Sequence, residues 1–115
     1  MSDDTPLLVL CTAPAEGDVA ATLARGLVDQ RLAACVNVVP GLRSFYRWEG
    51  AVHVDPEVTL MFKVSEEGLD RLVTALQALH PYDLPEIVVL PVDVDRSLDA
   101  YVDWVRAETG TGTPD

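Results

Sequence analysis

The sequence is poor in positive charge. It has 8 Lys and Arg residues against 19 Asp and Glu, a formal net charge of -11, and Lys63 is its only lysine. A protein that binds nucleic acid through a basic surface needs clustered Lys and Arg to neutralise phosphates, and attraction to an anionic membrane has the same requirement. We therefore expect neither nucleic acid nor a membrane as a partner.

Long apolar runs and cysteines are also scarce. No segment approaches the roughly 18 apolar residues of a transmembrane helix, and the first residues, MSDDTP, lack the positive charge and apolar stretch of a signal peptide. The two cysteines, Cys11 and Cys35, are too few for a disulfide framework. These absences predict a soluble, cytoplasmic protein with free thiols.

Catalytic sequence patterns are missing as well. The chain contains no GxSxG, GxGxxG, GxxxxGK[ST], HExxH or CxxC pattern. Its two histidines, His53 and His80, have no nucleophile placed beside them in the sequence. We therefore predict that the protein is not an enzyme.

The chain does contain enough apolar material for one core. Hydrophobic residues make up 49% of the 115 residues, and a chain of this length forms a single domain. We expect this domain to span residues 1–115, with flexible tails at 1–6 and 109–115.

Hydrophobic periodicity predicts alternating strands and helices. Ser65 is a candidate N-cap, and Pro81 should end the helix that follows it. Pro40, which with Gly41 interrupts the first hairpin strand, and Pro56 each remove a backbone donor, so the pairing should bulge or lie at a sheet edge there. The predicted elements are a strand at 7–13, a helix within 16–31, hairpin strands at 33–48 and 51–65, a helix at 66–79, a strand at 85–92 and a last helix within 97–109.

This βαββαβ order with an extra C-terminal helix predicts an α+β fold of the ferredoxin-like class. Right-handed crossovers place both crossover helices on one face of a four-stranded sheet, which leaves the other face uncovered. Both alternating sets of residues in the strands LLVLC and IVVL are apolar. The uncovered face would therefore expose an apolar patch, and we expect it to pack against copies of the same chain.

Cys11, His80 and Glu86 form a candidate metal site. A thiolate and an imidazole are ligands for copper and zinc, and a carboxylate can be a third ligand or a partner of the other two. Their spacing matches no short metal motif. The alternative is that Cys11 is an ordinary buried residue and His80 a polar helix terminus.

Other charged residues allow two interpretations each. Lys63 interrupts an apolar strand and is a candidate partner of Glu86, either as a structural ion pair or in a polar pocket that includes Tyr82. Arg31, Arg43 and Arg47 could receive an anion or meet acidic residues of another subunit.

Four separate blocks of the sequence resemble the CutA divalent-cation tolerance family. They occur in the family's order, and the resemblance runs from about Leu7 to Glu108. The blocks are LVLCTAP at 8–14, RLAACVNVVPG at 31–41, YRWEG at 46–50 and HPYDLPEIVVLPV at 80–92.

The resemblance implies a stable ferredoxin-like homotrimer that confers tolerance to copper and other divalent cations. By motif, the family's metal-associated residues fall on Cys11, His80 and Glu86. The implied ligand is Cu(II) or another divalent cation, with no obligatory cofactor. Some relatives carry a second histidine where this chain has Leu79, which removes one possible imidazole ligand.

The implied architecture is also similar to that of PII signalling proteins, which bind small effectors between subunits. By this analogy, Arg43, Lys63, Tyr82 and Glu86 would line an intersubunit pocket. The alternative function is therefore a PII-like signalling module that binds a small effector in that cleft.

Overall fold

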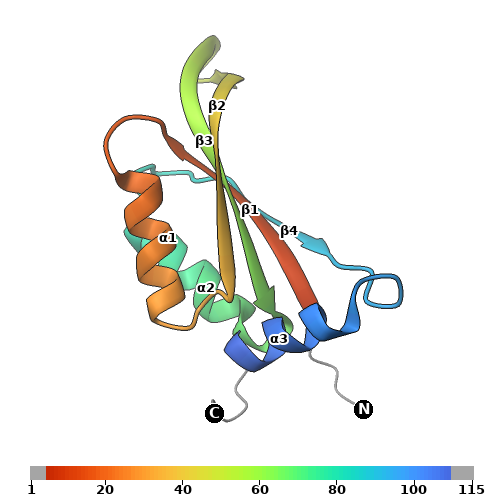
Figure 1. The fold of residues 1–115 in the computed structure, drawn as a ribbon. Coiled ribbons are helices and arrows are strands. Elements are labelled where there is room, and N and C mark those ends of the chain that lie inside the picture. The colour runs from red at the N-terminus through yellow and green to blue at the C-terminus, as the bar shows by residue number, and fades with distance from the viewer. Residues whose placement is uncertain (1–4, 110–115) are drawn as a thin grey trace.

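The computed structural model describes residues 5–109 and contains one antiparallel sheet with three helices. The strands lie in the order β2-β3-β1-β4, and every neighbouring pair is antiparallel (Figure 1). This topology confirms the predicted α+β, ferredoxin-like fold. The elements are β1 (Pro6–Pro14), α1 (Val19–Asp29), β2 (Cys35–Trp48), β3 (Ala51–Ser65), α2 (Glu66–Leu79), β4 (Ile87–Pro91) and α3 (Asp99–Thr109).

The core lies between the sheet and the pair of helices α1 and α2. Alternate residues of β1 and β3 point into it, and Leu60 and Phe62 are fully buried there. Leu27 of α1 and Leu76 of α2 are also fully buried in the same cluster. Helix α2 begins as predicted, because the Ser65 hydroxyl accepts a hydrogen bond from the Gly68 amide at 3.2 Å.

The opposite face of the sheet has no crossover helix, as predicted. Leu10 of β1 lies opposite Met61 on β3 and Val88 on β4, so the three side chains share this face. Leu90 adjoins them, and 48% of Val88 and 38% of Leu90 remain exposed. We call this surface the open face; helix α3 lies at one end of the sheet (Figure 1).

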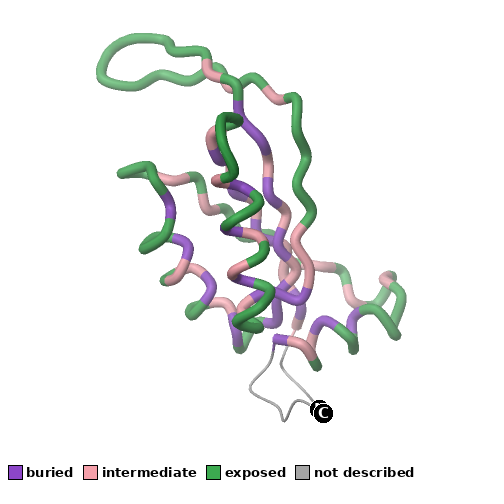
Figure 2. Tube along the Cα trace, turned by 60° about the vertical axis from the view of Figure 1, so that its left-hand side comes forward, coloured by how far each residue is buried: buried purple, intermediate pink, exposed green. Residues whose placement is uncertain are grey.

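The β2–β3 hairpin extends beyond the rest of the sheet. The register shifts between Val39 and Leu42, which confirms the predicted bulge at Pro40-Gly41. Residues 45–54 form an outer arm that is exposed on both sides (Figure 2), with Phe45 at 64% and Val52 at 63%. The arm gives the molecule principal extents of 49 × 27 × 22 Å.

The end of α3 is fixed to the body of the domain. The Thr109 hydroxyl accepts a hydrogen bond from the Ser65 amide at 2.9 Å, and Arg31 donates to the Ala107 carbonyl at 2.9 Å. Pro6 and Thr109, assigned to the tails by sequence, thus belong to β1 and α3. The predicted tails otherwise lie outside the described residues, apart from Thr5, whose carbonyl accepts a hydrogen bond from the Glu66 amide.

Both cysteines are free thiols, as predicted, and β3 separates their strands. Among residues 5–109 no helix has the length and apolarity needed to cross a membrane.

Candidate functional site

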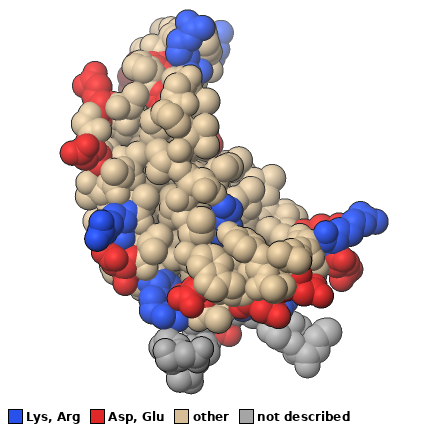
Figure 3. All heavy atoms as spheres, in the orientation of Figure 1, with Lys and Arg blue, Asp and Glu red and all other residues tan. Residues whose placement is uncertain are grey.

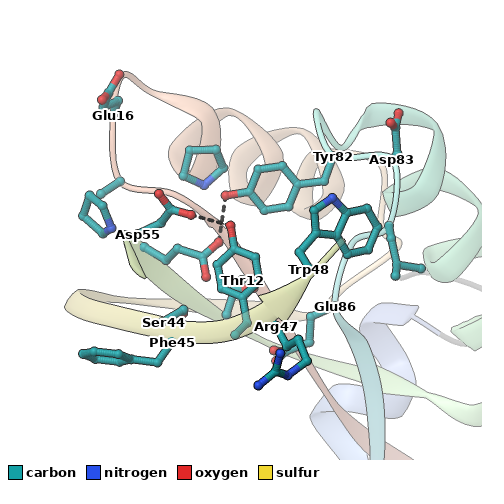
Figure 4. Close-up of a pocket in the computed structure, with 16 residues that line it drawn as sticks. Thr12, Glu16, Ser44, Phe45, Arg47, Trp48, Asp55, Tyr82, Asp83 and Glu86 are labelled. Atoms are coloured by element: carbon teal, nitrogen blue, oxygen red, sulfur yellow. Dashed lines mark hydrogen bonds between the residues drawn. The ribbon is translucent and has the colours of Figure 1, made fainter. Parts of the chain in front are cut away.

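A cleft of about 880 Å³ lies at the base of the outer arm. The end of β1, both hairpin strands and the loop at 82–86 form its walls (Figure 4). Volumes of roughly 300 to 1,000 Å³ are typical of small-molecule sites. Its polar and aromatic lining consists of Thr12, Glu16, Ser44, Phe45, Tyr46, Arg47, Trp48, Asp55, Glu57, Tyr82, Asp83 and Glu86.

Two tyrosine–carboxylate pairs lie on one wall of the cleft. The Tyr82 hydroxyl donates to Glu57 Oε2 at 2.7 Å, and the Tyr46 hydroxyl donates to Asp55 (Figure 4). Glu57 is only 6% exposed, whereas Tyr46 is 41% exposed. Burial, followed by the bond to Glu57, raises the pKa of Tyr82, and the bond to Asp55 raises that of Tyr46. Both phenols therefore remain protonated donors at neutral pH.

The cleft is strongly acidic. Five carboxylates line it, against the single guanidinium of Arg47, and the carboxylates are those of Glu16, Asp55, Glu57, Asp83 and Glu86. A wall of this composition repels anions and attracts cations, because negative charge gathered in a concave surface focuses the electrostatic potential.

His80 lies behind this wall and is only 7% exposed. Its Nε2 donates to the Thr12 carbonyl at 2.8 Å, and its Nδ1 accepts from the Tyr82 amide at 3.1 Å. The ring centroid lies 4.8 Å from that of Tyr82. Both ring nitrogens thus have partners within the chain, so His80 orients Tyr82 and presents no free lone pair to a metal ion.

Cys11 is fully buried in the core on the helix-covered face of the sheet. Burial, with smaller effects from Glu86 and Glu57, raises the pKa of its thiol to about 12. Across residues 5–109 no three His, Cys, Asp or Glu side chains converge closely enough to hold a metal ion. One chain therefore does not assemble Cys11, His80 and Glu86 as a metal centre, although Glu86 lines the cleft.

Lys63 is placed differently from either expectation. Its ammonium group donates to Asn37 and lies 3.9 Å from Cys35 Sγ, on the strand pair β2–β3. The predicted contact between Lys63 and Glu86 is therefore wrong within one chain. Lys63 on β3 pairs with Leu8 of β1, whereas Glu86 precedes Ile87 on the other side of β1, where Ile87 pairs with Cys11.

The three arginines of the predicted positive stretch also separate. Arg43 lies over the Phe45 ring, 5.8 Å from its centroid, and Arg31 pairs with Glu108 at 3.6 Å. Only Arg47 lines the cleft. Of the predicted intersubunit pocket, the structure brings together Tyr82 and Glu86; a meeting with Arg43 and Lys63 across subunits stays a prediction.

The sequence patterns did not indicate Tyr46, Trp48, Asp55 and Glu57 as residues of this site. A usable signal was present, because aromatic residues on one hairpin strand precede acidic residues on the other. The register pairs Ser44 with Asp55 and Leu42 with Glu57, which brings those carboxylates beside the aromatic strand.

Curated relatives are similar over nearly their whole length. The divalent-cation tolerance protein CutA of Thermus thermophilus is 48% identical over 103 residues, which cover 90% of this chain and 97% of the relative. The protein of the same name from Pectobacterium atrosepticum is 43% identical over 108 residues, covering 90% and 96%.

Solved structures agree with the fold. The T. thermophilus divalent cation tolerance protein superposes with a TM-score of 0.85 at 47% identity, covering 91% of this chain and 99% of that chain. A protein described as the PII-like protein CutA from Nostoc has a TM-score of 0.85 at 42% identity, covering 92% and 99%. The family model described as CutA1 divalent ion tolerance protein matches residues 7–108, and the chain therefore belongs to the CutA1 divalent ion tolerance family.

Proposed function

We propose that this protein acts as a homotrimer whose acidic clefts bind divalent cations, without catalysing a reaction. The observation that carries the proposal is the cleft wall, where five carboxylates oppose one guanidinium. The relatives are named for divalent-cation tolerance, which agrees with a cation ligand. The cleft tyrosines are protonated hydrogen-bond donors, as expected of a binding site rather than of a base or nucleophile.

The donor chemistry favours hard cations that keep much of their water, because no three His, Cys, Asp or Glu side chains of residues 5–109 converge on one point. Carboxylate oxygens suit Mg²⁺, Ca²⁺ and Mn²⁺, whereas a thiolate and an imidazole suit copper. The Cys11 thiol would have to ionise from a pKa of about 12, and His80 would have to give up a hydrogen bond. Of the three residues that the sequence indicated, the geometry supports Glu86 and gives no support to Cys11 and His80 as copper ligands.

Titration of the purified protein with Mn²⁺ and with Cu²⁺ tests this assignment. We expect Glu86→Gln to weaken binding of either cation, while Cys11→Ser leaves it unchanged. Asp29→Asn is the matched control, because Asp29 lies on α1 outside the cleft. If Cys11→Ser and His80→Ala lost Cu²⁺ binding while Glu86→Gln kept it, the result would instead favour the thiolate–imidazole site.

The open face supports the trimer. Uncharged side chains dominate the middle of the molecular surface in Figure 3, over the strands. Val88 and Leu90 would remain in water on a monomer, and burying such side chains contributes about 25 cal/mol for each Å² removed from water. Packing three open faces together removes this exposure.

Light scattering on a sizing column measures the assembly directly. Three chains of 12.5 kDa give about 37.5 kDa. Val88→Glu should dissociate the trimer by placing a charge on the open face. Val28→Glu is the matched control, because Val28 is 39% exposed but lies on α1, on the helix-covered side. A wild-type mass of 12.5 kDa at micromolar concentration would refute the trimer.

The size of the cleft favours a second candidate function, the binding of a small organic effector in the manner of a signalling module. The Nostoc relative is described as PII-like, which agrees with this alternative. A thermal-shift screen of nucleotides and metabolites against metal ions separates the two, since a ligand that binds only the folded state raises the midpoint. Shifts with metabolites alone would favour the effector.

A further inference from the structure

The acidic cleft also has an aromatic wall. Tyr46, Trp48 and Tyr82 line it, and each has at least 36% of its surface exposed. A site for a bare metal ion has no need of these rings, because metal ligands are oxygen, nitrogen and sulfur atoms. The aromatic wall therefore requires an explanation that the carboxylates alone do not give.

Aromatic faces and carboxylates together recognise organic cations. The face of a tryptophan, tyrosine or phenylalanine ring is electronegative and attracts a cation within about 6 Å of its centroid. Alkyl groups on the cation pack against the same rings, while the carboxylates supply longer-range attraction. Groups of aromatic side chains recognise quaternary ammonium ions in this way.

We propose that this cleft binds an organic ammonium ion, with the charged head among Trp48, Tyr82 and the carboxylates of Asp55 and Glu57. The inference goes beyond divalent-cation binding and does not depend on it. The phenol hydroxyls of Tyr46 and Tyr82 each bond a carboxylate, which fixes both pairs (Figure 4). Trp48 lies on the same side of the cleft as Tyr82 in that view.

The geometry suits such an ion better than a bare metal or an anion. A metal ion needs several ligands at about 2.0 to 2.6 Å from one point. No three His, Cys, Asp or Glu side chains in residues 5–109 converge in this way, so a metal ion here would keep much of its water, and one oxygen each of Asp55 and Glu57 already accepts a phenol. An anion would meet five carboxylates and one guanidinium. An ammonium head needs only the charge and the ring faces.

The chain's two tryptophans allow a matched experiment. Trp48 and Trp104 are both 42% exposed, but only Trp48 lines the cleft, because Trp104 lies on α3. In Trp104→Leu, Trp48 is the only tryptophan reporter. We expect choline to change its fluorescence in a saturable manner. The neutral isostere 3,3-dimethylbutan-1-ol should bind about tenfold more weakly, since it loses the cation–π and charge attraction.

Calorimetric titration of both tryptophan variants completes the test. Trp48→Leu should weaken choline binding about tenfold, while Trp104→Leu leaves it unchanged. If Trp48→Leu does not fold by circular dichroism, Tyr46→Leu replaces it, because Tyr46 also lines the cleft and is 41% exposed.

Three results would overturn the inference. They are no saturable choline signal, equal affinity for choline and its neutral isostere, and equal choline binding by Trp104→Leu and Trp48→Leu, or Tyr46→Leu where Trp48→Leu does not fold. Binding of Mn²⁺ without choline would leave the proposed function standing and remove this inference. Binding of choline without binding of Mn²⁺ would support this inference and refute divalent-cation binding by the cleft.

Discussion

Replacement of Tyr82 by phenylalanine tests the central hydrogen bond of the cleft. The Tyr82 hydroxyl donates to Glu57 Oε2 at 2.7 Å, and Glu57 is 6% exposed. Phenylalanine keeps the ring and removes only the donor. The nearly buried carboxylate would then lose a charge-assisted hydrogen bond that little water can replace.

Hydrogen bonds to charged groups contribute roughly 1.5 to 3 kcal/mol to stability. Tyr82 itself is 36% exposed, so solvent can partly reach the donor side. We therefore expect Tyr82→Phe to lower the free energy of unfolding by about 1 to 2 kcal/mol. Tyr46→Phe is the matched control. Tyr46 lies on the exposed arm, where water can replace its hydrogen bond to Asp55, so this variant should lose less stability.

The loss of stability in Tyr82→Phe should become smaller at high pH. The pKa of Tyr82 is raised in the folded protein, so the native phenol keeps its proton where the unfolded one ionises, above about pH 10. Above that pH the unfolded state binds fewer protons than the native state, and stability falls as pH rises. The stabilisation from Tyr82 is therefore fully present below about pH 10, and the difference between wild type and Tyr82→Phe should shrink above it.

Urea denaturation followed by circular dichroism, at fixed protomer concentration, measures these differences. The proposed role of the Tyr82–Glu57 hydrogen bond would be refuted if Tyr82→Phe lowered the free energy of unfolding no more than Tyr46→Phe does at pH 7. If the difference in the free energy of unfolding between wild type and Tyr82→Phe grew above pH 10, the assignment of Tyr82 as the donor would be contradicted.

Two further predictions concern packing and the buried thiol. Gly68→Ala should destabilise the fold by about 1 to 3 kcal/mol in the same assay, because its Cβ would lie 2.7 Å from the Thr109 carbonyl oxygen. Gly26→Ala in α1, with no atom near the added carbon, should instead stabilise the fold by about 0.5 to 1 kcal/mol. Equal changes in stability for the two variants would contradict the contact with α3. In a Cys35→Ser background, Cys11 should react with a thiol reagent at pH 8 only when urea unfolds the protein, because burial raises the pKa of its thiol to about 12. Rapid labelling of the native protein would contradict this prediction, because it would show that the thiol is accessible.

Periodicity along the chain was sufficient to predict the fold. The short apolar run of β1, the β-branched and aromatic residues of the hairpin and the spacing of leucines in α1 and α2 indicate strands and helices locally. Connection rules then leave few arrangements for the order βαββαβ. The uncovered sheet face followed from the same rules, and so did the separation of Cys11 from Cys35.

The site was harder to predict, because its contacts join residues far apart in the sequence. Tyr82 and Glu57 are separated by 25 positions, and the His80 ring bonds a carbonyl 68 positions away. Residue type suggested that His80 and Cys11 could be metal ligands. The free lone pair and the ionised thiol that such ligands require depend on hydrogen bonds and burial, which no sequence pattern displays.

The sequence by itself therefore determined the order of the elements, the acidic balance and, through four short blocks, the family. These properties depend on local spacing and composition. Only the tertiary structure decided which charged and aromatic side chains meet. The hairpin register placed Asp55 and Glu57 beside the aromatic strand and left Lys63 next to Cys35, away from Glu86. The physical reason is that a cleft is formed by side chains from several elements, whose meeting depends on how those elements pack.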